Sequence, residues 1–460
     1  MEISSAKIQY EERQLGDCLE LVIDHRGKTP KKLGADWVDQ GIPTVSAKNV
    51  NGGRLVSRDS IRFVSYDVYK KWMKQDVKRG DCFLVSEGAT LGECMLWDYD
   101  YPIVLGQRIF CLRADPNILY PRYLYAYMTS RAFQDEIIGR ATGTSVDGLR
   151  QTEVLKLKIT LPPLTQQRRI GDILYFLDNK IELNRRMNVT LEAMAQTLFQ
   201  SWFVDFDPVR AKLDGRQSFA IDNAVASLFP DCFEDSKLGK IPKGWSVGPL
   251  RALAESGRNS IAGGPFGSKL TRTDYVDKGI PVIRGSNMTA SMGWFRDCDF
   301  VYVSAEKAET LKTNMAAPGD VVFTQRGTLG QVALLPIDAC HPRYVISQSQ
   351  MKMTCASGVP PEYVYLFFRQ PSVIDYIIGN ATSSGVPHIN LSFLREFNVL
   401  LPSRNVLSAF ELAVRPLHRR ITSNANESEK LAAIRETLLP KLLTGEIRPA
   451  TINRELGSTR

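Results

Sequence analysis

The sequence has no uninterrupted apolar run near the roughly 18 residues that a membrane-spanning helix requires, so it predicts no membrane segment. Its first residues, MEISSAKIQYEERQL, are polar and show no targeting pattern. Cysteine is sparse, and the eight cysteines are scattered without a CxxC pair. This distribution favours free thiols in a reducing compartment over a disulfide framework, and we therefore expect a cytoplasmic protein.

Catalytic and metal-binding motifs are also missing. The stretch GGPFGSKL (263–270) comes nearest to a phosphate-binding loop, but its spacing is wrong. Neither a cofactor-binding glycine motif after a strand nor the N/D-P-P-aromatic motif of base methylation occurs. The four histidines form no HExxH pair and lie far from any group of cysteines. We therefore predict no catalytic residue, no metal ligand and no directly bound cofactor.

The charge balance is only mildly basic. Fifty-eight Lys and Arg against fifty Asp and Glu leave a net charge of +8. This value permits a nucleic-acid partner without proving one. At 460 residues and 43% hydrophobic content, the chain can fill the cores of more than one domain.

The most regular stretch is 164–203, which reads as one long helix with apolar residues every three or four positions. Written as heptads, it carries an apolar seam with asparagines at its centre, as in a coiled coil. From Gln166 to Phe203, at ~1.5 Å per residue, this helix would be roughly 57 Å long, which suits a spacer. A second set of heptad positions near the end of the chain lies 240 residues later. The predicted seam and partner-docking residues are Ile170, Leu174, Leu177, Ile181, Asn184, Asn188, Leu191, Leu198, Leu417, Ile421, Asn424, Leu431 and Leu438.

The regions before the two helices also repeat. GIPTVSAKNV (41–50) returns as GIPVIRGSNM (279–288), and other short blocks return in the same order. Each copy mixes short strands with a helix, which is typical of an α+β domain. The sequence thus predicts two tandem globules, each followed by a long helix.

If the two helices pair antiparallel, Asn184 faces Ser428 and Asn188 faces Asn424, and such polar layers fix register. An alternative is that these asparagines face solvent. Residues 422–429 are weak helix formers, which leaves a break in the second helix open. Pro440 stands where the first helix has Gln200, which leaves different helix ends open as well.

Polar loops recur at matching places in both globules. Glycine lets a backbone approach a ligand closely, Lys, Arg, Ser and Thr suit phosphate oxygens, and Arg, Gln and Asn can read base edges. Each cluster alone is also compatible with an ordinary turn. The candidate DNA-binding residues are Arg26, Lys28, Lys31, Lys48, Asn49, Thr90, Arg108, Thr142, Thr144, Ser145, Ser268, Lys269, Arg284, Ser286, Asn287, Arg326, Thr328, Thr382, Ser383 and Ser384.

With these features in view, the chain resembles the specificity (S) subunit of type I restriction–modification systems. The resemblance rests on 161–209, which looks like that family's central conserved helical region, on LLPKLLTGEI (438–447), and on LGKIPKGWSV (238–247). It implies the following segments: a first target recognition domain over 1–163, a central helix over 164–205, a linker over 206–244, a second target recognition domain over 245–402, a C-terminal helix over 403–446 and a tail over 447–460.

The resemblance further implies a non-catalytic subunit whose two domains each read one half of a split target on double-stranded DNA. The helices would form an antiparallel coiled coil that sets the gap and docks two methyltransferase (modification) subunits. Restriction subunits would join this core, and S-adenosylmethionine, ATP and Mg would bind the partner subunits. Two other classes remain open from the residues alone: a self-contained nuclease or methyltransferase, and a scaffold that grips protein partners.

Overall fold

The computed structural model describes residues 10–142, 148–216, 221–237, 239–288, 295–382 and 386–449. The chain divides into two compact units. The first unit joins Met1–Ile181 to Lys430–Arg460, and the second is Glu182–Glu429. The first unit thus combines both ends of the sequence, and each long helix contributes residues to both units.

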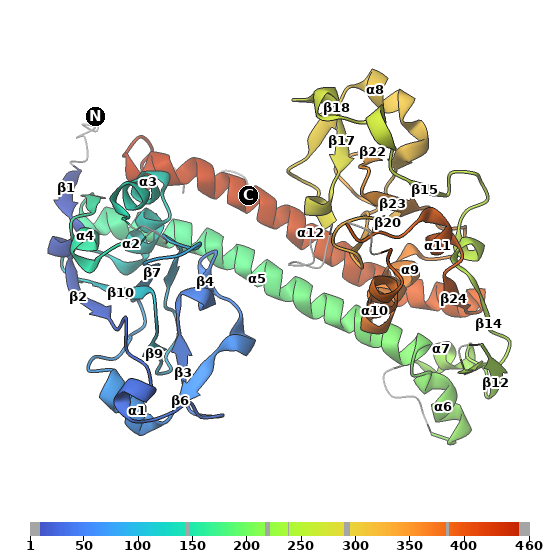
Figure 1. The fold of residues 1–460 in the computed structure, drawn as a ribbon, viewed down its shortest axis with the longest axis horizontal. Coiled ribbons are helices and arrows are strands. Elements are labelled where there is room, and N and C mark those ends of the chain that lie inside the picture. The colour runs from blue at the N-terminus through green and yellow to red at the C-terminus, as the bar shows by residue number, and fades with distance from the viewer. Residues whose placement is uncertain are drawn as a thin grey trace, which may run out of the picture. The chain divides into compact units, whose positions relative to one another are not determined.

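The two long helices are α5 (Leu164–Phe203) and α12 (Arg404–Leu443), each an unbroken helix of 40 residues (Figure 1). Both bounds of α12 lie 240 residues after those of α5. The alternatives of a break at 422–429 and of different helix ends are therefore wrong. Pro440 is exposed near the end of α12, where water can satisfy the carbonyl group that lacks its usual N–H partner.

The globular part of the first unit is called the first domain, and its described residues form four sheets. Its strands, sheet by sheet in spatial order, are β1 (Glu11–Gln14) and β11 (Lys158–Leu161); β2 (Leu19–Asp24), β10 (Ile109–Ala114), β7 (Cys82–Val85) and β8 (Cys94–Leu96); β6 (Arg62–Val64), β3 (Ile42–Val45) and β9 (Val104–Leu105); and β4 (Val50–Asn51) with β5 (Arg54–Leu55). Its short helices are α1 (Tyr66–Trp72), α2 (Pro121–Met128), α3 (Arg131–Arg140) and α4 (Gln151–Leu155).

The globular part of the second unit, the second domain, repeats this order. Its strands, sheet by sheet, are β14 (Ser246–Pro249) and β24 (Asn398–Leu401); β15 (Ile261–Gly263), β23 (Gln350–Met353), β20 (Val321–Thr324) and β21 (Val332–Leu334); and β16 (Tyr275–Val276), β18 (Val301–Val303), β17 (Ile280–Ile283), β22 (Tyr344–Ile346) and β19 (Met315–Ala316). Its helices are α8 (Ala305–Thr310), α9 (Pro361–Phe368), α10 (Pro371–Gly379) and α11 (Leu391–Arg395).

Equivalent elements therefore occupy equivalent places in the two four-stranded sheets. The only parallel pairings in the described residues, β3 with β9 and β17 with β22, are also equivalent. Local details repeat as well: Ser65 caps α1, and Ser304 caps α8. The internal repeat predicted from the sequence is confirmed.

The central strands of each four-stranded sheet are buried on both faces. In β7, Cys82 and Leu84 belong to one apolar core, and Phe83 and Val85 belong to another. Successive side chains of a strand point to opposite faces, so a continuous apolar run such as CFLV serves two cores. The sheet is thereby fixed as a scaffold, and the loops at its ends carry the polar residues.

A polar layer joins α5 to α12 within the second unit. The Asn184 amide group donates to Ser428 Oγ (3.3 Å) and Glu427 Oε2 (2.8 Å). Asn424 donates to Asn188 Oδ1 (2.9 Å), and Asn188 donates to the Ile421 carbonyl oxygen (3.2 Å). The predicted pairs of Asn184 with Ser428 and Asn188 with Asn424 are confirmed. The three asparagines are buried, so the solvent-facing alternative is wrong.

The last turns of α12 belong to the core of the first domain. Leu439, Leu442 and Leu443 lie in the same apolar cluster as Ile170 and Leu174 of α5. All of the predicted seam residues on both helices are buried or half-buried.

The segment between α5 and the second domain is ordered where it is described. It contains α6 (Asp207–Leu213), α7 (Asn223–Ser227) and a hairpin of β12 (Phe233–Ser236) with β13 (Gly239–Pro242). None of the described helices is long and apolar enough to cross a membrane.

Candidate nucleic-acid interface

A groove of about 570 Å³ opens on the second domain and gathers polar side chains from four stretches of the chain. Hydroxyl and amide side chains line it, among them Thr271, Thr324, Thr328, Ser347, Ser349, Gln331, Gln348 and Gln350. It also contains three arginines, Arg272, Arg284 and Arg326, and none of the described residues that line it is acidic. A concave surface with this charge and these donors suits the phosphates and base edges of a nucleic acid.

Arg284 follows β17 and is held from its backbone. Its N–H donates to Asn287 Oδ1 (3.0 Å), and the Asn287 amide group donates to the carbonyl oxygens of Arg296 (3.2 Å) and Cys298 (2.9 Å). The Arg284 side chain is half-buried, and its Nε is buried without a hydrogen-bond partner among the described residues. The second domain therefore holds a positioned guanidinium group that no described carboxylate neutralises.

Arg326 and Thr328 lie on the turn after β20 and are exposed. Between them, Gly327 has a φ of 95°, which a residue with a side chain rarely adopts. The Arg326 N–H donates to the Ser349 carbonyl oxygen (3.3 Å). His388 forms isolated bridges to both Arg326 and Thr382, which brings Thr382 next to this turn.

The loop before the groove is fixed by one glutamine. Gln348 Nε2 donates to the carbonyl oxygens of Gly267 (2.7 Å) and Leu270 (3.2 Å). A Cβ added at Gly264 would lie 1.9 Å from the Ser347 carbonyl oxygen, so only glycine fits this approach. Ser268 and Lys269 are exposed on this pinned loop.

Gln107 does the same in the first domain. Its Oε1 accepts from the Gly27 N–H (2.9 Å), and its Nε2 donates to the Lys28 carbonyl oxygen. Both domains thus pin a glycine-containing loop to the turn before β10 or β23. Gln107 and Gln348 therefore hold these loops in place through backbone groups.

The basic side chains of the first domain are more often engaged within the domain. Arg26 pairs with Asp24 (2.7 Å), and its guanidinium carbon lies 4.5 Å from the Phe110 ring centroid. The ammonium groups of Lys28 and Lys48 donate to the carbonyl oxygens of Trp72 (3.0 Å) and Ser60 (3.1 Å). Lys31, by contrast, is exposed in a short 3-10 turn.

A second polar cluster of the first domain surrounds Arg108. This residue has a φ of 62°, is exposed, and pairs with Glu87 at 3.1 Å. Gly148 bridges to Glu87 and to Thr142, as His388 does to Arg326 and Thr382 in the other domain. Thr90 is half-buried on the same turn after β7. The clusters are equivalent, but Glu87 occupies the place of Arg326.

Two sequence candidates do not fit a DNA-contacting role. Asn49 is 0% exposed and Asn287 is 1% exposed. Asn49 accepts from the Ser46 N–H (3.1 Å) and donates to the Ser57 carbonyl oxygen (3.2 Å), which matches the bonding of Asn287. Both asparagines hold a turn, because their amide groups satisfy backbone groups inside the domain. Ser286 is exposed beside Asn287.

Four further candidates, Thr144, Ser145, Ser383 and Ser384, lie outside the described residues. Two residues that line the groove, Thr271 and Arg272, are missing from the candidates predicted from the sequence, which end at Lys269 in this loop. The signal was present as TRTD directly after the loop, but the alternation of charges there is also typical of a solvated turn.

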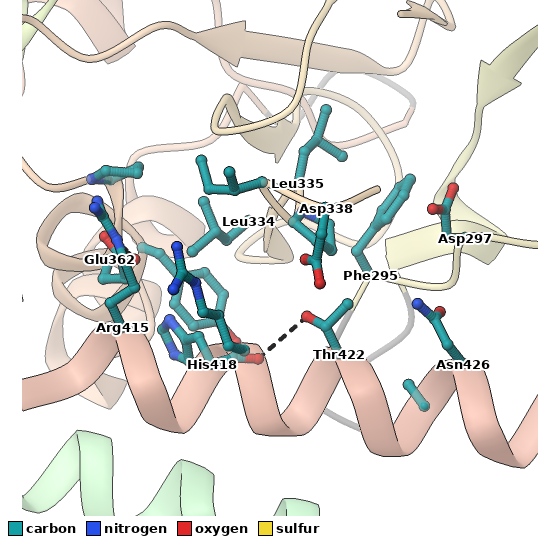
Figure 2. Close-up of a pocket in the computed structure, with 16 residues that line it drawn as sticks. Phe295, Asp297, Leu334, Leu335, Asp338, Glu362, Arg415, His418, Thr422 and Asn426 are labelled. Carbon is teal, nitrogen blue, oxygen red and sulfur yellow. Dashed lines mark hydrogen bonds and ion pairs between the residues drawn. The ribbon is translucent and has the colours of Figure 1, made fainter. Parts of the chain in front are cut away.

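A separate, smaller cavity of about 50 Å³ lies between the second domain and α12 (Figure 2). Arg415, His418 and Thr422 project into it from α12, and Arg415 pairs with the buried Glu362 at 3.2 Å. Burial lowers the pKa of His418 to about 4, and its ring packs edge-on against Tyr365. The ion pair of Arg415 with Glu362 and the ring contact of His418 with Tyr365 hold α12 against α9 beside this cavity. No described group of acidic, cysteine and histidine side chains suits a metal ion.

Residues 7–193 match the family model described as "Type I restriction modification DNA specificity domain". The type I restriction enzyme HindI specificity subunit of Haemophilus influenzae is 26% identical, over 81% of this chain and 88% of its own length. The MjaIX specificity subunit of Methanocaldococcus jannaschii is 23% identical, over 71% of this chain and 69% of its own. The crystal structure of an S subunit from M. genitalium matches the fold with a TM-score of 0.60 at 16% identity, over 96% of this chain and 98% of that one.

Proposed function

Because the chain belongs to the family of specificity subunits of type I restriction–modification systems, we propose that its two domains each read one half of a bipartite DNA target. The family is the DNA-recognition part of these systems and is not catalytic alone, so the chain is not an enzyme. The reading of separate half-sites goes beyond family membership and is the substance of the proposal.

The observation that carries the proposal is the equivalence of the two polar clusters. In each domain, the turn after β7 or β20 lies beside a loop that a glutamine side chain holds by hydrogen bonds. The glutamine is Gln107 in the first domain and Gln348 in the second. The two domains nevertheless differ at equivalent positions, with Glu87 in the place of Arg326 and Ser46 in the place of Arg284. A common frame with different side chains is what two readers of different sequences require. The side chains proposed to face DNA are Lys31, Thr90, Arg108 and Thr142 in the first domain, and Ser268, Lys269, Arg284, Ser286, Arg326, Thr328 and Thr382 in the second.

The two helices would set the distance between the half-sites as an antiparallel coiled coil. A helix of 40 residues is about 60 Å long at ~1.5 Å per residue. Half-sites one duplex turn apart are separated by roughly 34 Å and present the same face, which a helix pair of this length can bridge. The buried Asn184–Ser428 and Asn188–Asn424 contacts support one fixed register and hence one gap length.

The same helices would dock two methyltransferase subunits. Leu183 and Met194 of α5 are 51% and 49% exposed and lie three helical turns apart, so they share one face of the helix. Exposed apolar side chains in such a row are typical of a protein interface. Restriction subunits would join this assembly. S-adenosylmethionine, ATP and Mg would bind the partner subunits, because the chemistry belongs to them.

A methylation map tests the proposal. The full chain is produced together with a modification subunit of the same type I system in a host without adenine methylation, and modified adenine is then located by sequencing. We expect two short sequences separated by a fixed non-specific gap. Exchange of residues 245–402 with those of a relative should change one half of the motif and leave the other half and the gap intact. Methylation without a bipartite motif, or a motif that changes as a whole, would contradict the proposal.

A further inference from the structure

The three arginines of the second-domain groove differ in how firmly they are held. Arg272 and Arg326 are exposed, and neither has an ion-pair partner among the described residues. Arg284 is half-buried, with its backbone tied to Asn287 and its Nε removed from solvent. A long exposed side chain pays a high entropy cost to hold one geometry, whereas a packed side chain is already positioned.

The carboxylate nearest in sequence to the groove does not neutralise these arginines. Asp274 pairs with Lys307 at 2.8 Å and also accepts hydrogen bonds from the N–H and hydroxyl groups of Thr271. The Arg284 guanidinium group therefore sits half-buried without a described acidic partner. Partial burial of an unpaired charge is unfavourable unless a ligand supplies acceptors.

Base edges differ in the acceptors they present. Guanine offers O6 and N7 side by side in the major groove, which matches two N–H groups of one guanidinium, and no other base presents this pair. A phosphate also accepts from arginine, but it carries no sequence information and tolerates a mobile side chain. Position, more than charge, thus separates a base-reading arginine from a phosphate-binding one.

Resting on the proposed function, we propose that Arg284 is the guanine-reading residue of the second domain and that Arg272 and Arg326 bind flanking phosphates. Asn287 is then a positioning residue, because it fixes the backbone from which Arg284 projects. The first domain has Ser46 at the equivalent position, where its hydroxyl group donates to Asn49 Oδ1 (3.0 Å). The first domain therefore has no such reader at this turn.

The decisive comparison uses the assembled complex and a duplex that carries the mapped target. Arg284→Lys keeps the charge but loses the two parallel N–H donors of the guanidinium group. Affinity for the target should therefore fall about tenfold to a hundredfold. Affinity for random duplex should change by less than about threefold. Arg326→Ala is the matched control: it should weaken target and random duplex alike and reduce the slope of log affinity against log salt by about one.

A second arm changes the DNA and leaves the protein intact. The guanines of the half-site that the second domain reads are replaced one at a time by 7-deazaguanine, which lacks the N7 acceptor. At one position this should weaken wild-type binding about tenfold, and it should weaken the Arg284→Lys complex no further. This arm remains decisive if the variant folds poorly, because it needs only the wild-type complex.

The outcomes separate the two claims. If no bipartite motif exists, the proposed function fails and this inference with it. If the motif is bipartite but its second half has no G:C pair, or no 7-deazaguanine substitution weakens binding, only the inference fails. Uniform weakening of all duplexes by Arg284→Lys would also overturn it, because Arg284 would then be a phosphate contact.

Discussion

The amide group of Asn424 donates a hydrogen bond of 2.9 Å to the amide oxygen of Asn188, and these residues are only 1% and 6% exposed. One lies on α12 and the other on α5, 236 positions apart in sequence. A shift of either helix by one turn would break this hydrogen bond and also the one from Asn184 to Ser428. The layer therefore selects one alignment of the helices in the second unit, at the cost of apolar packing.

A double-mutant cycle at this layer tests its role. Asn424→Leu leaves the Asn188 oxygen buried without its donor and should lower the free energy of unfolding by about 1–3 kcal/mol. Asn188→Leu with Asn424→Leu removes both groups and should restore most of that loss. Denaturant unfolding of the full chain provides the measurement, with the exposed Glu436→Ala as a control. Additive losses in the double variant would argue that the two amides do not interact.

The end of α12 should be essential to the first domain. Leu442 is 0% exposed in the core of that domain, so Leu442→Ala should cost about 2–5 kcal/mol of stability. Leu412→Ala removes the same atoms from a side chain of α12 that is 79% exposed and should change stability by less than about 0.5 kcal/mol. Limited proteolysis should show faster cleavage within 10–161 for Leu442→Ala alone. Equal stability of the two variants would mean that the first domain closes its core without this helix.

Gln107 and Gln348 should each stabilise only the loop of the domain in which they lie. Gln107→Ala removes the bonds that hold the Gly27–Lys28 loop, and Gln348→Ala removes those at Gly267 and Leu270. Each substitution should raise amide hydrogen exchange about thirtyfold in its own loop, since two hydrogen bonds of about 1 kcal/mol each are lost. We expect each variant to weaken recognition of one half-site. Loosening of both loops by either variant would contradict this independence.

Glu87 should weaken the binding of DNA by the first domain. Its carboxylate pairs with Arg108 at 3.1 Å, and both groups are partly exposed. Glu87→Gln removes one negative charge and frees the arginine, so DNA affinity at low salt should rise about threefold to tenfold, with less effect at high salt. Asp135→Asn, an exposed carboxylate on α3, is the charge-matched control. A sequence-specific loss of binding in Glu87→Gln would instead make Glu87 a base-reading residue.

Stability should fall in acid through His418. Burial lowers its folded pKa to about 4 from the ordinary 6.5, so the unfolded chain binds the proton more readily. The contribution of neutral His418 is complete above pH 6.5 and is lost as the pH falls towards 4, by about 3 kcal/mol in all. His418→Gln should flatten this part of the pH profile of unfolding. His25, whose pKa burial and Lys28 also lower to about 4, should retain part of the slope. An identical slope in wild type and His418→Gln would contradict the assignment.

Local pattern predicted the long helices and their polar contacts within the second unit. Heptad spacing is a property of neighbouring residues, so Asn184 and Asn424 could be placed in one polar layer from their positions alone. Helix propensity was a poorer guide, because the weak helix formers at 422–429 and the proline at 440 lie within one continuous helix. Packing of α12 against apolar partners outweighs those preferences, because most helix stability in proteins comes from the buried face.

The sequence by itself determined the duplication, the two 40-residue helices and the class of side chains at each loop. Only the tertiary structure decided which of those side chains are available to a ligand. Arg26 and Arg284 look alike as sequence, yet the first is paired with Asp24 and the second has no described partner. Asn49 and Asn287 look like base readers, yet they are buried in turns. Availability depends on which groups the folded backbone brings within about 3 Å of each side chain, and residue type and spacing alone do not give those distances.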